Sequence, residues 1–217
     1  MNDELEVVAP ATPGRRERNR ERVKTRLYDS ALRLFTENGY ERTSVDQIAE
    51  DADVARGTFF NHFQRKEDLL TTWGENRRRR LREGLAASPP AHSGHRLKDM
   101  LDRCMDVLAD VNEQEEQVTR AMLIAWVKAG RPILEEPFAG EIFADVVEAA
   151  HQRGEIDSSV DSHRVGNLLR DAYLGALYRW SNKPDEADLR TELHAVVDIV
   201  VSGVVRTPEA SQPHLVP

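Results

Sequence analysis

Apolar side chains recur at intervals of three and four residues along most of the 217-residue chain, which is the period of an amphipathic α-helix. In the N-terminal third this period predicts four helices, over 17–38, from Val45, over 56–62 and from Lys66 to about Leu85. Gly39 follows the first helix and is a typical C-terminal stop. Ser44, with Gln47 three residues later, has the pattern of a capping box.

Paired prolines with glycine and serine interrupt the helical period at 87–95, because they cannot continue a helix. The period then resumes in five segments, which carry Leu97 to Val111, 114–129, Phe138 to Ala150, 162–181 and 186–206. Asp161 and Asp185 are expected to cap the last two of these helices. A strand is a local alternative for the β-branched run VVDIVVSGVV, but the run continues the helical period, and we predict a helix.

The pattern therefore predicts an all-α fold of about nine helices in two domains. The N-terminal domain spans 15–86 and includes the connecting helix, 87–95 is a linker, and the C-terminal domain spans 96–206. Residues 1–14 and 207–217 are expected to be a disordered leader and tail. The single cysteine, Cys104, lies on an apolar stripe, which predicts a buried structural thiol.

Charge is distributed unevenly along this acidic chain, whose net charge is -8. Between Arg15 and Leu85 there are 17 Lys and Arg against 13 Asp and Glu, a net of +4, whereas 86–217 carries 13 against 22, a net of -9. Only the first part is expected to face nucleic acid, since an acidic surface repels phosphate. No segment has the roughly 20 consecutive apolar residues of a membrane span, nor does the N-terminus have a signal pattern, so we expect a cytoplasmic protein without membrane contact.

The segment TSVDQIAEDADVARGTFFNHFQRKEDLL has the layout of a helix-turn-helix, in which the second short helix enters the major groove of DNA. Over about residues 18–72 it resembles the tetracycline-repressor (TetR) family, in NGY before the first short helix, TSVDQIAEDADVARGTFFNHF across the motif, and KEDLL after it. The resemblance implies a repressor that binds a double-stranded, palindromic operator as a homodimer. It also implies a C-terminal domain that dimerises through its last two helices and binds an unknown small-molecule effector, which releases the DNA.

The start of the second short helix carries the residues expected to read bases. Arg56 can pair bidentately with guanine, Thr58 is short enough to reach a base edge, and Gly57 lets the backbone approach the DNA. Asn61 is a weaker candidate. Phe60 occupies a position where the resembled family commonly has tyrosine, so it would keep a packing surface without a phosphate donor. The family positions that usually touch phosphates are occupied here by Thr43, Ser44, His62 and Lys66.

Aromatic and methionine side chains of the C-terminal segments are candidates for the wall of an effector pocket, since such residues line adaptable apolar sites. They are Met105, Met122, Trp126, Phe138, Phe143 and Tyr173. Asp171 and Tyr178 share a second face of the penultimate helix and are candidate polar anchors. Ordinary core packing is the alternative for the apolar residues, and a surface ion pair is the alternative for Asp171.

Enzymatic function is not favoured, because the histidines are scattered and no HExxH, GxSxG or phosphate-binding glycine loop occurs. We predict no catalytic residues, no cofactor and no metal site. Two alternatives within the same class stay open at this point. The chain could activate transcription instead of repressing it, and its C-terminal domain could be controlled by a protein partner rather than a metabolite.

Overall fold

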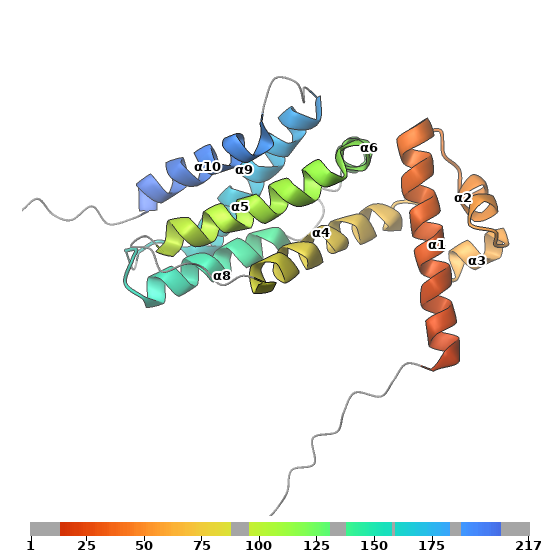
Figure 1. The fold of residues 1–217 in the computed structure, drawn as a ribbon, viewed down its shortest axis with the longest axis horizontal. Helices are drawn as coiled ribbons and strands as arrows, with labels where there is room; N and C mark the ends of the chain where they lie inside the picture. The colour runs from red at the N-terminus through yellow and green to blue at the C-terminus, as the bar shows by residue number, and fades with distance from the viewer. Residues whose placement is uncertain (1–13, 88–95, 131–137, 158, 183–187, 205–217) are drawn as a thin grey trace, which may run out of the picture. The chain divides into compact units, whose positions relative to one another are not determined.

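The computed structural model describes residues 14–87, 96–130, 138–157, 159–182 and 188–204. Over these residues the regular secondary structure is α-helical, as the hydrophobic pattern predicts (Figure 1). The chain divides into two compact units, which meet in the sequence between Leu69 and Leu70. Within the described ranges, none of the helices is both long enough and apolar enough to cross a membrane.

The N-terminal unit contains three helices, α1 (Arg15–Asn38), α2 (Val45–Asp51) and α3 (Arg56–Phe60). The inner stripe of α1 is buried at Leu27, Ala31 and Phe35. The helix ends at Gly39, whose amide donates to the Phe35 carbonyl at 3.0 Å and whose φ of +82° favours glycine. The predicted stop is therefore confirmed.

The start of α2 is built as the sequence predicts. The Ser44 hydroxyl accepts the Gln47 amide at 3.2 Å, and the Gln47 side chain accepts the Ser44 amide at 2.8 Å, which completes the capping box. After Ala52, Asp53 adopts a left-handed conformation with φ of +52°, and it redirects the chain into α3. Ile48, Ala49 and Ala52 are buried on the inner side of α2.

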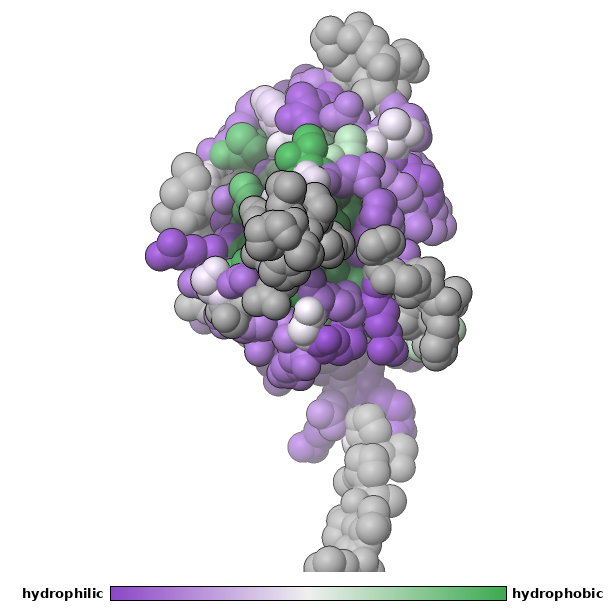
Figure 2. Space-filling view, turned by 90° about the vertical axis from the view of Figure 1, so that its left-hand side faces the viewer, coloured by the Kyte–Doolittle hydropathy of each residue, from purple (hydrophilic) through white to green (hydrophobic). Residues whose placement is uncertain are grey.

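The helices described in the C-terminal unit are α4 (Asp68–Ala87), whose first two residues precede the boundary, α5 (Arg96–Gln114), α6 (Glu116–Lys128), α8 (Phe138–Gln152), α9 (Ser162–Asn182) and α10 (Leu189–Val204). All of α4 from Leu70 onward groups with this unit, although the hydrophobic pattern placed the connecting helix with the N-terminal domain and the boundary at 87–95. Seen end-on over α5, α8 and α10, hydrophobic side chains reach the surface near the middle of a mostly hydrophilic face (Figure 2).

Helix ends account for most of the differences from prediction. The second short helix ends at Phe60 and not at 62, and α4 begins at Asp68 and not at Lys66. The amides of Asp68 and Leu69 bond three residues back, at 3.1 and 3.2 Å, so 65–68 forms a tight turn before the helix. At the other end of the chain, the β-branched run is confirmed as helical in α10.

Aspartates cap the last two helices. Asp161 accepts the Arg164 amide at 3.0 Å, as predicted for α9. The aspartate that caps α10 in the described residues is Asp188, which accepts the Thr191 amide at 3.0 Å. The predicted cap Asp185 lies outside the described residues.

One buried core joins α5, α8, α9 and α10. Cys104 lies fully inside it, and burial raises the pKa of its thiol to about 12, so the structural thiol is confirmed. At Gly166, α9 lies close against α8. A Cβ at Gly166 would lie 2.3 Å from the Gly140 carbonyl oxygen and 2.8 Å from the Ala144 amide nitrogen of α8.

We expect Gly166→Ala to lower the free energy of unfolding by about 1–3 kcal/mol, because both clashing atoms belong to the backbone and cannot rotate away. Gly57→Ala is the control, since its new Cβ meets no atom within 4 Å. Urea unfolding followed by circular dichroism measures both variants. Equal stability of Gly166→Ala and wild type would contradict the close α8–α9 packing.

Candidate nucleic-acid interface and effector site

The second short helix, α3, is anchored by two aromatic side chains and presents its other side to solvent. Phe59 and Phe63 are both buried, and their ring centroids are 5.5 Å apart. Arg56, Gly57 and Asn61 are exposed, so three of the residues predicted to contact DNA lie on the solvent side of this helix. Thr58 is only partly exposed.

Arg56 is held in the free protein by two weak contacts. Its Nη1 lies 3.2 Å from Asp46 Oδ2 of α2, and its guanidinium lies 5.8 Å from the centroid of the Phe60 ring. The side chains of Arg56 and Asp46 are 64% and 61% exposed, so this ion pair contributes about 0–1 kcal/mol. The Arg56 guanidinium can therefore separate from Asp46 at small cost.

Gly57 and Phe60 show features that internal packing does not explain. A Cβ at Gly57 would meet no protein atom within 4 Å. Phe60, expected to keep a packing surface, is 45% exposed and touches the buried Phe59 ring edge-on at 5.4 Å. The exposed part of the Phe60 ring is available for contact with a partner.

Two of the predicted phosphate contacts are turned inward. The Thr43 hydroxyl is buried and donates to the Gly39 carbonyl at 2.9 Å. The Lys66 ammonium donates to the Tyr40 and Thr43 carbonyls at 2.8 and 3.0 Å, and it lies 4.0 Å from the centroid of the Tyr40 ring. Both side chains therefore donate to carbonyls of the turn between α1 and α2. The sequence alone does not show that they point toward this turn.

Ser44 and His62 remain near the surface. Ser44 is exposed, although its hydroxyl already caps α2. Burial lowers the pKa of His62 below its usual 6.5, and the positive charges of Arg20 and Lys24 lower it further. The negative charge of Glu21 acts in the opposite direction and raises it. At pH 7 His62 is therefore mostly neutral and can approach a phosphate only as a hydrogen-bond donor.

The C-terminal unit contains a buried polar network that the sequence pattern did not predict. Arg77 of α4 is buried, and it donates to the Val111 carbonyl at 2.8 Å and to the Thr119 hydroxyl at 3.1 Å. Its Nη2 also lies 3.0 Å from a carboxylate oxygen of Glu115. Arg77 lies between Trp73 and Leu81 at a position where the helical period predicts an apolar residue. A charged residue at that position is the feature of the sequence that could have indicated a buried network.

The network continues to α9. Asn112 is fully buried and donates to the Tyr173 hydroxyl oxygen at 3.0 Å and to the Leu108 carbonyl at 2.6 Å. Burial raises the pKa of Tyr173, which stays protonated. The Thr119 hydroxyl lies 3.2 Å from the Asn112 carbonyl oxygen. Side chains of α4, α5, α6 and α9 are thus joined by one set of hydrogen bonds.

Two indole rings lie beside this network. Trp73 of α4 and Trp126 of α6 meet edge-to-face with centroids 6.1 Å apart, and the Arg77 guanidinium lies 5.1 Å from the centroid of the Trp73 ring. Both indole N–H groups are buried, and within the described part of the chain neither has a hydrogen-bond partner. A buried donor without an acceptor is costly, by about 1–3 kcal/mol, so the pair is suited to an oxygen-bearing ligand.

The predicted effector residues separate into two groups. Met105, Phe143 and Tyr173 are buried in one core, against which Trp126 packs, and Met122 is also buried. Asp171 and Tyr178 do not join them, because their face of α9 points to solvent. Asp171 accepts a hydrogen bond from Arg170 at 2.9 Å, and Tyr178 is exposed. The side chain of Phe138 lies outside the described residues.

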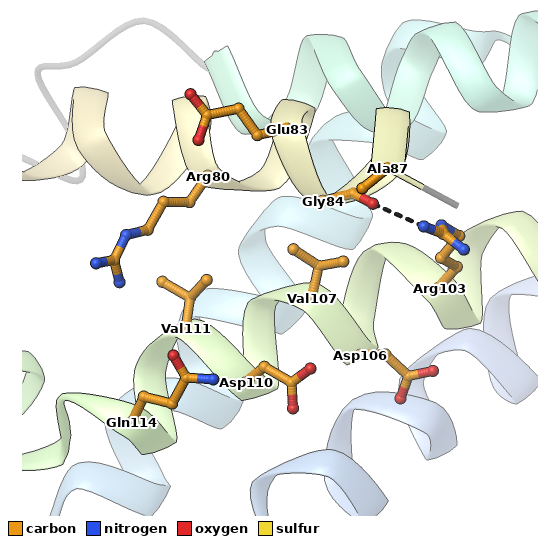
Figure 3. A pocket seen from close by; sticks show the side chains of 10 residues that line it. All are labelled: Arg80, Glu83, Gly84, Ala87, Arg103, Asp106, Val107, Asp110, Val111 and Gln114. Atoms are coloured by element: carbon orange, nitrogen blue, oxygen red, sulfur yellow. Dashed lines mark hydrogen bonds between the residues drawn. The ribbon is translucent and has the colours of Figure 1, made fainter. Parts of the chain in front are cut away.

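A groove of about 610 Å³ runs between α4 and α5 (Figure 3), and none of the predicted effector residues line it. Its charged groups are already paired. The Arg103 guanidinium donates to the Gly84 carbonyl at 2.6 Å, and Arg80 pairs with Glu115 at 2.8 Å. Asp106 and Asp110 both pair with Arg190 of α10. Such a groove offers a ligand little uncompensated charge.

Two family profiles match the chain and together cover most of it. The profile of bacterial regulatory proteins of the tetR family matches residues 27–72. The profile of the C-terminal domain of TetR/AcrR family transcriptional repressors matches residues 79–203. The first match contains α2 and α3, and the second contains most of the buried network, with Arg77 just before it.

Individual relatives agree with both profiles. The transcriptional repressor KstR of Mycolicibacterium smegmatis is 27% identical over 199 residues, which cover 89% of this chain and 91% of that protein. The regulator TcmR of Streptomyces glaucescens is 42% identical over 76 residues, about a third of each chain.

Solved structures show the same fold. The repressor FadR of Thermus thermophilus, in complex with lauroyl-CoA, has a TM-score of 0.64 and 25% identity, and the match covers 87% of this chain and 99% of that one. The repressor SmeT of Stenotrophomonas maltophilia has a TM-score of 0.67 and 19% identity over 89% of this chain and 97% of its own.

Proposed function

Because the chain belongs to the TetR/AcrR family of transcriptional repressors, we propose that it binds a palindromic operator as a homodimer and that a small molecule releases it. The observation that carries the DNA-binding part is the solvent side of α3, where Arg56 and Gly57 are exposed and the Phe60 ring is 45% exposed. We assign base readout to Arg56 and Thr58, and an apolar contact with a base or sugar to Phe60. Ser44, Asn61 and His62 contact the DNA backbone, whereas Thr43 and Lys66 hold the turn behind them.

Exposed apolar residues on the last two helices support the homodimer. Leu168 of α9 is 56% exposed and Ile199 of α10 is 72% exposed, and Tyr178 of α9 is exposed as well. Gly175 lies on the same side of α9 between Leu168 and Tyr178, which permits close helix approach. Two copies that pair through this face are related by a two-fold axis, which accounts for a palindromic operator.

The unpartnered indoles support an effector site between α4 and α6. Trp73 and Trp126 would offer N–H donors to a carbonyl or carboxylate oxygen, and the neighbouring apolar core would receive the rest of the molecule. An effector of this class has an apolar body and an acceptor oxygen. By binding one arrangement of α4 more tightly than another, it would shift the protein away from the DNA-binding state.

Operator binding is tested by selecting bound fragments from the source genome and comparing Arg56→Ala with wild type. We expect Arg56→Ala to lose about 1–3 kcal/mol of preference for the selected fragment over random DNA, while salt-sensitive binding to both is retained. Arg26→Ala is the charge-matched control, because Arg26 is exposed on the outer side of α1. Unchanged preference in Arg56→Ala would remove it from base readout, and the absence of any selected fragment would overturn the function.

The homodimer is tested with the double variant Leu168→Glu/Ile199→Glu. Both positions are exposed, so the monomer should fold, whereas two unpaired charges in the interface should weaken association at least about a hundredfold. Light scattering during size-exclusion chromatography reports the mass. Ile124→Glu, at an exposed apolar position of α6, is the control. A double variant that stays dimeric would place the interface elsewhere.

The effector site is tested by thermal-shift screening of apolar carbonyl and carboxylate compounds, with lauroyl-CoA as the first probe. We expect Trp126→Phe, which keeps an aromatic ring but removes the donor, to weaken binding of a stabilising compound about tenfold, equivalent to the removal of one hydrogen bond. Trp180→Phe, at a buried position of α9, is the control. Equal binding by both variants would move the site away from the indole pair.

A further inference from the structure

The first three turns of α1 lie outside the segment that matches the family. The matched region begins at residue 27, whereas α1 begins at Arg15. All residues from Arg15 to Arg22 are exposed, so this part of the helix has no core of its own. In Figure 1 the N-terminal turns of α1 project beyond α2 and α3. The extension therefore needs an explanation other than packing within the unit.

Charge on this extension is strongly positive in an otherwise acidic chain. Residues 15–26 contain seven Arg and Lys against two Glu, a net of +5, while the whole chain has a net charge of -8. The basic residues form two stripes with a spacing of four. The inner stripe is Arg16, Arg20 and Lys24, and the outer stripe is Arg18, Arg22 and Arg26.

The inner stripe continues the line of Leu27 and Ala31, whose side chains are buried. One face of α1 is thus apolar where it packs against the rest of the N-terminal unit, and it is basic in the turns that extend beyond α2 and α3. The same part of α1 lies close to the end of α3, since the charges of Arg20, Glu21 and Lys24 all act on His62, two residues after that helix. The inner stripe and the solvent side of α3 are therefore neighbouring parts of one surface.

We propose that the inner stripe of α1 binds backbone phosphates of the DNA that flanks each operator half-site. This inference rests on the proposed DNA binding and adds a contact outside the helix-turn-helix. From Leu27 to Arg15 the helix extends about 18 Å, at 1.5 Å per residue. That is the length of about five base pairs at 3.4 Å each. Phosphate contacts carry no sequence information, so the flanks bind whatever their sequence.

The test compares two triple variants that remove the same charge from the same helix. The inner variant is Arg16→Gln/Arg20→Gln/Lys24→Gln, and the outer variant is Arg18→Gln/Arg22→Gln/Arg26→Gln. Glutamine has nearly the helix propensity of arginine and lysine, and circular dichroism confirms that α1 is kept. Binding to the tightest genomic fragment is measured from about 50 to about 200 mM salt, a range that resolves counterion release. The measurement uses the full fragment and one trimmed next to the half-sites.

We expect the inner variant to bind the full fragment at least about tenfold more weakly at low salt. Its plot of log affinity against log salt should be shallower by about 0.9 for each phosphate that the variant no longer neutralises. Trimming should weaken wild type and the outer variant, but not the inner variant. Equal salt slopes for the two variants, or equal effects of trimming, would overturn the flanking contact while leaving operator binding intact. A wild-type protein that binds no fragment would overturn both proposals.

Discussion

The short helix α3 has almost no stability of its own, and contacts with the rest of the N-terminal unit hold it in place. A helix of five residues is far below the length that is stable in water, so α3 depends on tertiary contacts for both its conformation and its orientation. Those contacts are the buried rings of Phe59 and Phe63 on one side and the left-handed turn at Asp53 before the helix. Because packing uses only the inner side, the outer side is free to vary with the operator.

The polar side chains around α3 divide by where their hydrogen bonds are satisfied. Lys66 and Thr43 use their donors on carbonyls of the preceding turn, which makes that turn rigid. Arg56 contacts an exposed carboxylate and the face of a partly exposed ring, so under the proposed function it would exchange these partners for DNA at small cost. Rigid support beneath an exchangeable surface keeps the entropic cost of binding low, because few groups must be ordered on contact.

Local signals in the sequence predicted the helices well, and orientation about each helix axis was the main source of error. Caps at Ser44 and Asp161 depend on residues within one turn, so they can be read directly. Asp171 lies on α9 with the buried Tyr173 but on the opposite, exposed side of the helix. Which side of α9 is buried depends on the helices that pack against it. Arg77, a charged residue inside an apolar stripe, is a position where the sequence does carry information about orientation. A buried charge requires hydrogen-bond partners, and Arg77 finds them on α5 and α6.

Those partners give α4 a second role beyond connecting the two units along the chain. Its first two residues, Asp68 and Leu69, belong to the unit that carries α3, whereas Arg77 bonds to α5 and α6 within the other unit. The hydrogen bonds of Arg77 are directional and buried. A ligand that inserts beside Trp73 would therefore either leave these hydrogen bonds intact or break them by moving α4 as a rigid body. A ligand that preserved them would bind both arrangements equally and could not change DNA affinity. Under the proposed function, an effector that lowers DNA affinity would therefore have to compete with the Arg77 bonds at the contact of α4 with α6.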